Sequence, residues 1–225
     1  MPSTVTIEKL VYGGDGLARI DGQVLLAPFV LPGESVSLNS IKSGKGLLRS
    51  VSSELVQASP HRVTPRCEYF GSCGGCQYQH AEYDYQVAAK VGILRETLRR
   101  LGGIQYENEI PAIAADPWAY RNRIQLHFAG REAGFHVHGS HDLRAINHCH
   151  ISAPLLVEAI RRIQEAAKSD KWPRFLSSLE LFTNGSELQL NVLDSTRPVA
   201  ARISVIISIR SSTKPKASRA TTLSS

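Results

Sequence analysis

Cysteines are the residues of this chain with the clearest chemical potential. Three of the four, Cys67, Cys73 and Cys76, fall within ten residues, whereas Cys149 stands alone. The two glycines between the last pair let a short loop wrap one centre with its backbone amides turned towards sulfur. Spacing of this kind is typical of a metal-sulfur site.

Three kinds of site compete for these thiols. Disulfides need an oxidising compartment, but we find no signal peptide and no apolar run long enough to span a membrane. A four-cysteine zinc site usually takes two Cys-x-x-Cys knuckles, and this chain has one, although a histidine could join the ligands. A 4Fe-4S cluster held by three neighbouring cysteines and one remote cysteine fits the spacing best.

The cysteine segment also carries a longer motif. From Cys67 to Lys90 the pattern is Cys-x5-Cys-Gly-Gly-Cys-Gln-Tyr-Gln-His-x2-Tyr-x2-Gln-x3-Lys. It resembles the iron-sulfur segment of the RNA (uracil-5-)-methyltransferases, which methylate C5 of uridine in 23S ribosomal RNA or tRNA. Residues 118–123 and 134–149 are similar to motifs of that family's central domain. The resemblance runs from about Val5 to about Val192, and it implies that Cys149 is the fourth cluster ligand.

Six residues within the two central motifs have side chains suited to contact RNA. Arginine and asparagine supply paired planar donors, and an aromatic ring can stack on an unpaired base. The alternative is that the two arginines make structural ion pairs. The six residues are Tyr120, Arg121, Asn122, Arg123, Ser140 and His141.

Composition by itself does not indicate a nucleic-acid-binding protein. The 225 residues carry a formal charge of +6, but six basic and no acidic residues lie beyond Asp194. Residues 1–194 therefore carry 20 basic and 20 acidic side chains. The proportion of hydrophobic residues, 42%, is ordinary for a globular protein, and we expect a cytoplasmic one without membrane contact.

The elements that must position these residues divide the chain into four parts. Residues 1–58 have short apolar runs and a turn signal about every ten residues, which predicts a small OB-like β-barrel. The resembled family places an RNA-binding TRAM domain here. Residues 59–103 form the iron-sulfur loop and a helix over 83–101, with one apolar stripe that ends at Gly102 and Gly103. The stripe consists of Val87, Val91, Leu94, Leu98 and Leu101.

Residues 104–194 form the third part, a mixed α/β central domain that binds RNA in the resembled family. We expect strands at 124–128 and 134–137, a helix from about Pro154, and a hairpin that turns at Asn184 and Gly185. Residues 195–225 are rich in Ser and Thr and lack acids, so we expect a disordered tail, although 203–209 could form one more strand.

The family's catalytic chemistry needs residues that this pattern does not offer. In that family an S-adenosylmethionine-binding domain follows the central domain, and one of its cysteines attacks C6 of uracil. After Gly139 the only glycine is Gly185, and all four cysteines are committed to the cluster. We therefore expect no catalytic residue, no cofactor-binding site and an absent catalytic Rossmann-like methyltransferase domain. The expected fold class is α+β, with the OB-like barrel, the cluster-binding loop and the mixed α/β central domain.

Two functions follow from these expectations. The first is the N-terminal portion of an S-adenosylmethionine-dependent 23S rRNA (uracil-5-)-methyltransferase-like protein, truncated or frameshifted near Ser195, that binds RNA and a 4Fe-4S cluster. The second is a freestanding RNA-binding iron-sulfur module without methyltransferase activity. The expected partner is RNA, rRNA before tRNA, for a monomeric chain that a separate methyltransferase domain could complement. An electron-transfer role is disfavoured, because no flavin or nicotinamide fingerprint accompanies the cysteines.

Overall fold

The structure is a computed structural model that describes residues 3–44, 46–198 and 204–207. The chain divides into two compact units. Unit 1 consists of Met1–Trp118 and Gly134–His150, and unit 2 of Ala119–Ala133 and Ile151–Ser225. No helix within the described ranges is long and apolar enough to cross a membrane.

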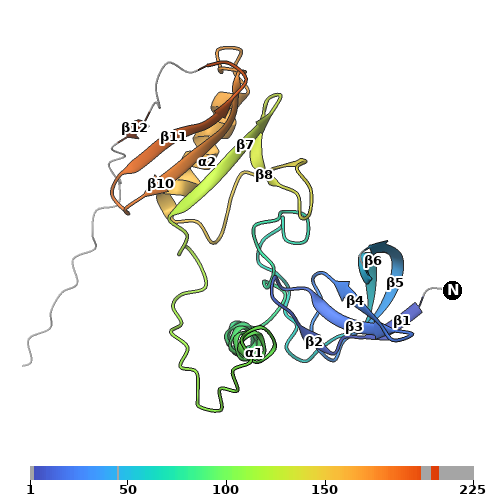
Figure 1. Ribbon diagram of the computed structural model, residues 1–225. Coiled ribbons are helices and arrows are strands. Elements are labelled where there is room, and N and C mark those ends of the chain that lie inside the picture. The colour runs from blue at the N-terminus through green and yellow to red at the C-terminus, as the bar shows by residue number, and fades with distance from the viewer. Residues whose placement is uncertain (1–2, 45, 199–203, 208–225) are drawn as a thin grey trace, which may run out of the picture. The chain divides into compact units, whose positions relative to one another are not determined.

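Unit 1 begins with a six-stranded sheet in the order β1-β5-β6-β4-β3-β2 (Figure 1). Neighbouring strands are antiparallel except for the parallel pair β4 and β6. Because β1 also contacts β3, the sheet is curled over its own core of small and aliphatic side chains, among them Ile7, Leu25 and Val36. Strands thus occur throughout the region where a barrel was expected, although β5 and β6 have 10 and 11 residues and are not short. The assignment of this region to a TRAM domain stays a prediction. The strands are β1 Ser3–Thr6, β2 Lys9–Leu10, β3 Gly16–Ile20, β4 Gln23–Ala27, β5 Ser35–Gly44 and β6 Leu47–Gln57.

A buried carboxylate ties this sheet to the chain that leaves it. Glu34 has no exposed surface and accepts hydrogen bonds from the backbone N–H groups of Leu31, at 2.8 Å, and Ser59, at 3.2 Å. Arg62 donates to both carboxylate oxygens, from Nε at 2.5 Å and Nη2 at 2.7 Å. Burial alone would raise the pKa of Glu34, but the bonds from Arg62 and the two N–H groups outweigh it and lower that pKa. The carboxylate therefore stays ionised at neutral pH.

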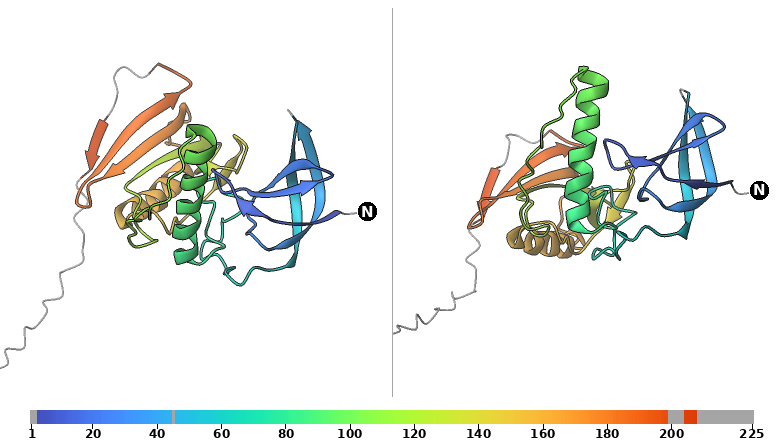
Figure 2. Two further views of the ribbon diagram at one scale, coloured as in Figure 1. Left: turned by 60° about the horizontal axis from the view of Figure 1, so that its bottom comes forward. Right: turned by 90° about the horizontal axis from the view of Figure 1, so that it is seen from below.

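The helix α1 (Tyr83–Gly102) confirms the predicted helix and its end. Gly103 adopts the left-handed conformation, with φ of 64°, and its N–H bonds to the Leu98 carbonyl, which closes the helix. The segment after the helix runs back alongside it (Figure 2). Arg95 of α1 donates to the carbonyl of Asn108 in this segment at 3.1 Å.

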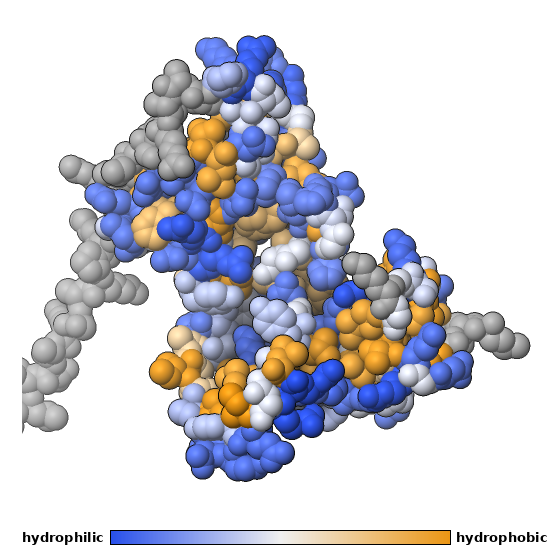
Figure 3. All heavy atoms as spheres, in the orientation of Figure 1, coloured by the Kyte–Doolittle hydropathy of each residue, from blue (hydrophilic) through white to orange (hydrophobic). Residues whose placement is uncertain are grey.

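The apolar stripe of α1 is not the face that packs on the core of unit 1. Tyr85, Ala89 and Ile93 contact a small cluster of Leu10, Leu31 and Ala81, and Glu96 pairs with Lys9 at 2.5 Å. At 100° per residue the stripe lies on the opposite side of the helix. Its members Leu94 and Leu101 are 46% and 85% exposed, and Figure 3 shows apolar surface in the region of α1.

Unit 2 combines one amphipathic helix with most of a second sheet, whose last strand, β9, belongs to unit 1. The sheet order is β12-β11-β10-β7-β8-β9, and the boundary between the units falls within β8. Helix α2 (Pro154–Ala167) starts at the predicted proline, contacts β10 and buries Leu156, Ile160 and Ile163. The strands are β7 Arg123–Ala129, β8 Glu132–His136, β9 Leu143–Ala145, β10 Leu176–Thr183, β11 Leu188–Ser195 and β12 Ser204–Ile207.

The predicted hairpin is confirmed between β10 and β11. The side-chain oxygen of Asn184 accepts the N–H groups of Ser186 and Glu187, and Gly185 takes a φ of 98°. Of the tail that was expected to be disordered, the structure describes residues 195–198 and the strand β12, which pairs with β11. The rest of 195–225 lies outside the described residues.

Replacing Glu34 by alanine should lower the free energy of unfolding of unit 1 by about 3–5 kcal/mol. The change leaves a charged, largely buried Arg62 without its carboxylate and two backbone N–H groups without an acceptor. Urea unfolding followed by circular dichroism measures the loss. Glu8→Ala is the matched control, because Glu8 pairs with Arg19 in solvent and should cost about 1 kcal/mol or less. Equal losses in the two variants would contradict the assigned role of Glu34.

Candidate metal centre and RNA-binding residues

The cysteine loop, defined here as residues 67–76, is anchored to the chain that follows β8. Gly74 donates to the carbonyl of His136 at 2.9 Å, and His138 donates to the carbonyl of Ser72 at 3.0 Å. Between these bonds, Cys73 and Val137 form an antiparallel bridge. A Cβ on Gly74 would lie 3.2 Å from the His136 carbonyl oxygen, closer than is comfortable. Any larger residue at this position would therefore push the two segments apart by a few tenths of an ångström.

The four thiols share unit 1 and the same half-buried environment. None of them forms a disulfide. The backbone N–H of Gly75 points to the sulfur of Cys73 at 3.4 Å, which is the amide-to-sulfur contact expected around a metal-bound thiolate. Burial raises the pKa of the Cys67 thiol, and the nearby Cys149 raises it further. The remote cysteine therefore lies within electrostatic range of the loop.

A tyrosine links the loop to the segment that carries Cys149. The Tyr69 carbonyl accepts the N–H of Cys73 at 2.8 Å, and its hydroxyl oxygen accepts the N–H of Asn147 at 3.3 Å. Sequence reasoning missed Tyr69, because a tyrosine inside the motif gives no sign of which distant backbone group it meets.

The donor set has the right chemistry for a soft metal centre. Four thiols on one unit, with an N–H directed at one sulfur, match the requirements of iron-sulfur chemistry. Within the described residues, however, no three His, Cys, Asp or Glu side chains are gathered closely enough to hold a metal ion. Cys67, Cys73, Cys76 and Cys149 thus remain predicted ligands.

A buried, neutral histidine packs against an aromatic residue of the cysteine loop. His80 is buried against the ring of Phe70, with 5.4 Å between centroids. Neither ring nitrogen makes a hydrogen bond of normal geometry to any described group, although the backbone of Val30 lies close. Burial lowers the pKa of His80 to about 4, and the positive charge of Arg62 contributes to the same shift.

Four of the six predicted RNA-binding residues lie together in unit 2, where β7 begins. Tyr120 is 59% exposed. Arg123 is also largely exposed, but its Nη1 lies 3.4 Å from Glu180 and its guanidinium 5.3 Å from the ring centroid of Phe182. The ion-pair alternative therefore holds for Arg123, in a geometry that leaves much of the guanidinium accessible.

The neighbours of Arg123 also serve the backbone. Arg121 exchanges backbone hydrogen bonds with Ile151, at 2.7 Å, and Ala153, at 2.9 Å. The Asn122 carbonyl accepts the N–H of Thr183 at 2.9 Å. These bonds fix the backbone of 121–122, while the side chain of Asn122 is exposed.

The other two predicted RNA-binding residues, Ser140 and His141, belong to unit 1. The Ser140 hydroxyl donates to the Asp142 carboxylate at 2.7 Å and accepts its backbone N–H at 3.0 Å, which makes a tight turn. His141 is exposed beside His136, with 5.3 Å between ring centroids. The six residues therefore do not form one group within either unit.

Known proteins similar to this chain are RNA methyltransferases. An uncharacterized RNA methyltransferase of Halalkalibacterium halodurans is 37% identical over 169 residues, which cover 73% of this chain and 37% of the relative. The 23S rRNA (uracil(1939)-C(5))-methyltransferase of Dichelobacter nodosus is 36% identical over 170 residues, covering 71% and 40%. This chain belongs to the RNA (uracil-5-)-methyltransferase family. It spans less than half the length of these relatives, and no family model matches it.

A solved structure of this family has a similar fold. The tRNA (uracil-54, C5)-methyltransferase of Pyrococcus abyssi, in complex with S-adenosyl-L-homocysteine, matches with a TM-score of 0.56 and 26% sequence identity. The match covers 79% of this chain and 42% of the archaeal one.

This match corrects the predicted fold class. We expected an α+β protein from which the catalytic Rossmann-like methyltransferase domain is absent, and that expectation is wrong, because most of the chain follows the fold of a methyltransferase bound to a cofactor product. The expectation rested on the lack of a glycine-rich loop after Gly139 and on the commitment of four cysteines. A sequence motif gives information only about the stretch of chain in which it occurs. Their absence from one stretch therefore says nothing about the fold to which that stretch belongs.

Acidification should destabilise unit 1 through His80. The unfolded histidine takes up a proton as the pH falls below about 6.5, whereas the folded one does so only near 4. The contribution of His80 to the free energy of unfolding is constant well above pH 6.5, the pKa of His80 in the unfolded chain. It falls by about 2 kcal/mol between about pH 7.5 and about pH 5. Urea unfolding at the two pH values should show that His80→Leu loses this dependence and that the exposed control His141→Gln keeps it. An unchanged dependence in His80→Leu would show that another group titrates.

Proposed function

We propose that the protein takes part in the C5 methylation of uridine in ribosomal RNA, with S-adenosylmethionine as the methyl donor and a 4Fe-4S cluster in unit 1. Membership of the family supports the reaction class, and the archaeal relative was solved with the demethylated form of this donor. Ribosomal RNA is favoured over tRNA because identity to the 23S rRNA enzyme, 36%, exceeds identity to the tRNA enzyme, 26%.

The observation that carries the cluster proposal is the set of four unbridged, half-buried thiols in one unit. Cys67, Cys73, Cys76 and Cys149 would hold the cluster. When bound, it would join the cysteine loop to the segment of Cys149 and bring the capacity to exchange an electron. The chain itself contributes the Gly75 N–H directed at the Cys73 sulfur and the link through Tyr69. Three neighbouring cysteines and one remote cysteine favour iron over a zinc site built from two knuckles.

The residues proposed to contact RNA act by different means. The exposed ring of Tyr120 can stack on an unpaired base, and Arg123 can offer its guanidinium to a phosphate. Asn122 can donate to a base edge. In unit 1, Ser140 and His141 can add hydrogen bonds from an exposed turn. Together these contacts would bind and orient the RNA for the methyl transfer.

Protein purified without oxygen should contain about four iron and four sulfide ions per chain, with broad absorbance near roughly 400 nm. Cys149→Ser should lose most of the iron, because three thiolates hold a cluster more weakly than four. His148→Ser, which alters a neighbour of Cys149, should keep it and serves as the control. Iron, zinc and sulfide analysis of the three proteins decides the matter: one zinc without sulfide would overturn the cluster proposal.

Arg123→Gln should weaken binding to single-stranded RNA and reduce the slope of log affinity against log salt by about 0.7, the contribution of one phosphate contact. Fluorescence anisotropy over a range of salt concentrations measures the slope. Arg161→Gln is the matched control, since Arg161 is an arginine on α2 of similar exposure, 52% against 62% for Arg123, that pairs with Glu158 and Glu165. If both variants change the slope alike, or neither does, Arg123 makes no specific phosphate contact.

A further inference from the structure

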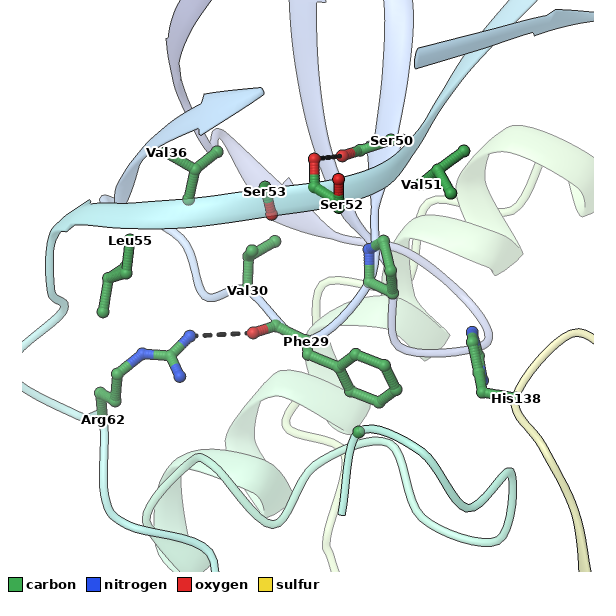
Figure 4. Close-up of a pocket in the computed structure, with 12 residues that line it drawn as sticks. Phe29, Val30, Val36, Ser50, Val51, Ser52, Ser53, Leu55, Arg62 and His138 are labelled. Carbon is green, nitrogen blue, oxygen red and sulfur yellow. Dashed lines mark hydrogen bonds between the residues drawn. The ribbon is translucent and has the colours of Figure 1, made fainter. Parts of the chain in front are cut away.

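Unit 1 contains a cavity of about 420 Å³ that none of the proposed sites uses (Figure 4). The cavity, called the Phe29 cavity below, lies between β6, the loop after β4 and the glycine at position 71 of the cysteine loop. Its size is within the range of about 300–1,000 Å³ that is usual for small-ligand sites. Its lining residues are Pro28, Phe29, Val30, Val36, Ser50, Val51, Ser52, Ser53, Leu55, Arg62, Gly71 and His138.

Phe29 is held in an uncommon backbone conformation at this cavity. Its φ of 59° is left-handed, which a bulky residue adopts rarely and at a cost of about 1–3 kcal/mol. The Nη2 of Arg62 donates to the Phe29 carbonyl at 2.9 Å, and Arg62 is itself fixed by Glu34. A strained residue kept in place by a buried ion pair indicates that the position of the ring matters.

The ring of Phe29 leaves room for a stacking partner. It meets Phe70 and His138 at interplanar angles of 71° and 61°, with centroids 5.1 Å and 5.0 Å away. These are edge contacts, and among the described residues no ring lies parallel to that of Phe29. A flat ligand could therefore stack on this ring between the two edge contacts.

The facing wall of the cavity offers hydrogen bonds. Ser50, Ser52 and Ser53 come from β6, which crosses above Phe29 in Figure 4. The Ser50 hydroxyl donates to the Ser52 carbonyl at 3.2 Å, while the half-buried Ser53 has a hydroxyl without a partner within the described part of the chain. Because successive side chains of a strand alternate between its faces, the exposed Ser52 points away from Phe29 and Ser53 points towards it (Figure 4). A hydroxyl can donate and accept, so this wall can meet either kind of polar group on a ligand edge. The guanidinium of Arg62 adds a cationic donor at the side.

We propose that the Phe29 cavity binds one unpaired nucleobase of the RNA, stacked on Phe29 with its edge towards Ser53. The inference rests on the proposed function, which makes RNA the substrate. A nucleobase is the component of RNA that combines a flat face with a polar edge, as the aromatic ring and the hydroxyl wall require. A base within a duplex cannot enter, because both its faces are already stacked, so the cavity selects single-stranded or looped RNA.

The test measures the affinity of the full chain for two oligomers of equal charge, a twelve-residue oligouridylate and the same backbone with abasic spacers. Wild-type protein should bind the oligouridylate more tightly. Phe29→Gly should weaken that binding about 5- to 100-fold, the range for loss of one base stack, without changing its salt slope. Glycine suits the left-handed backbone of position 29, so this variant should fold. Tyr12→Ala, which removes an 89% exposed ring elsewhere in unit 1, should bind like wild type.

Ser53→Phe provides a second variant that fills the cavity from β6 and leaves Phe29 in place. It should weaken binding of the oligouridylate as Phe29→Gly does, with circular dichroism spectra like those of wild type. Equal binding of both oligomers by wild-type protein, or unchanged affinity in both variants, would overturn the cavity proposal while leaving RNA as the substrate. If wild-type protein binds neither oligomer nor a structured rRNA fragment, the proposed function fails together with this inference.

Discussion

The structure of unit 1 depends on the buried carboxylate of Glu34. An isolated charge at this depth would cost several kcal/mol, so the site is stable only because Arg62 and two backbone N–H groups surround it. The same contacts join the loop after β4, the chain after β6 and the carbonyl of Phe29. One ion pair therefore fixes both the direction in which the chain leaves the sheet and the strained residue of the Phe29 cavity.

The cysteine loop begins five residues after Arg62. Because Glu34 holds Arg62 in place, the start of the loop is held in place as well. Its other supports are backbone bonds to the chain after β8 and the contact of Phe70 with His80. His80 is buried and neutral, so the side chain that Phe70 packs against carries no charge. No acidic residue is therefore needed beside His80 to balance a positive charge. The cluster proposed above would join this loop to Cys149, and the four thiols would have to come closer together to hold it, because the described residues show no gathered set of metal ligands.

Local features of the fold could be read from the sequence, because they depend on neighbouring residues alone. Gly103 ends α1, Pro154 begins α2, and Asn184 with Gly185 turns the hairpin, each through its own backbone preference. The long-range choices could not. The packed face of α1 mixes Tyr85 with alanine, isoleucine and glutamate, so a search for apolar spacing selected the opposite, purely aliphatic stripe. The burial of Glu34 and the left-handed Phe29 likewise depend on Arg62, about thirty positions away, and leave no local signal.

The balance of charge constrains how RNA could be recognised. Residues 1–194 carry as many acidic as basic side chains, so the net charge of this stretch provides no general attraction to RNA, and counterion release comes only from local phosphate contacts. Arg123 illustrates the point: Glu180 already lies beside it, and a phosphate would have to compete with that carboxylate. Further affinity would come from contacts that do not depend on charge. Stacking and base-edge hydrogen bonds are such contacts, and in unit 1 the Phe29 cavity is where an aromatic face, a free hydroxyl and a positioned guanidinium occur together.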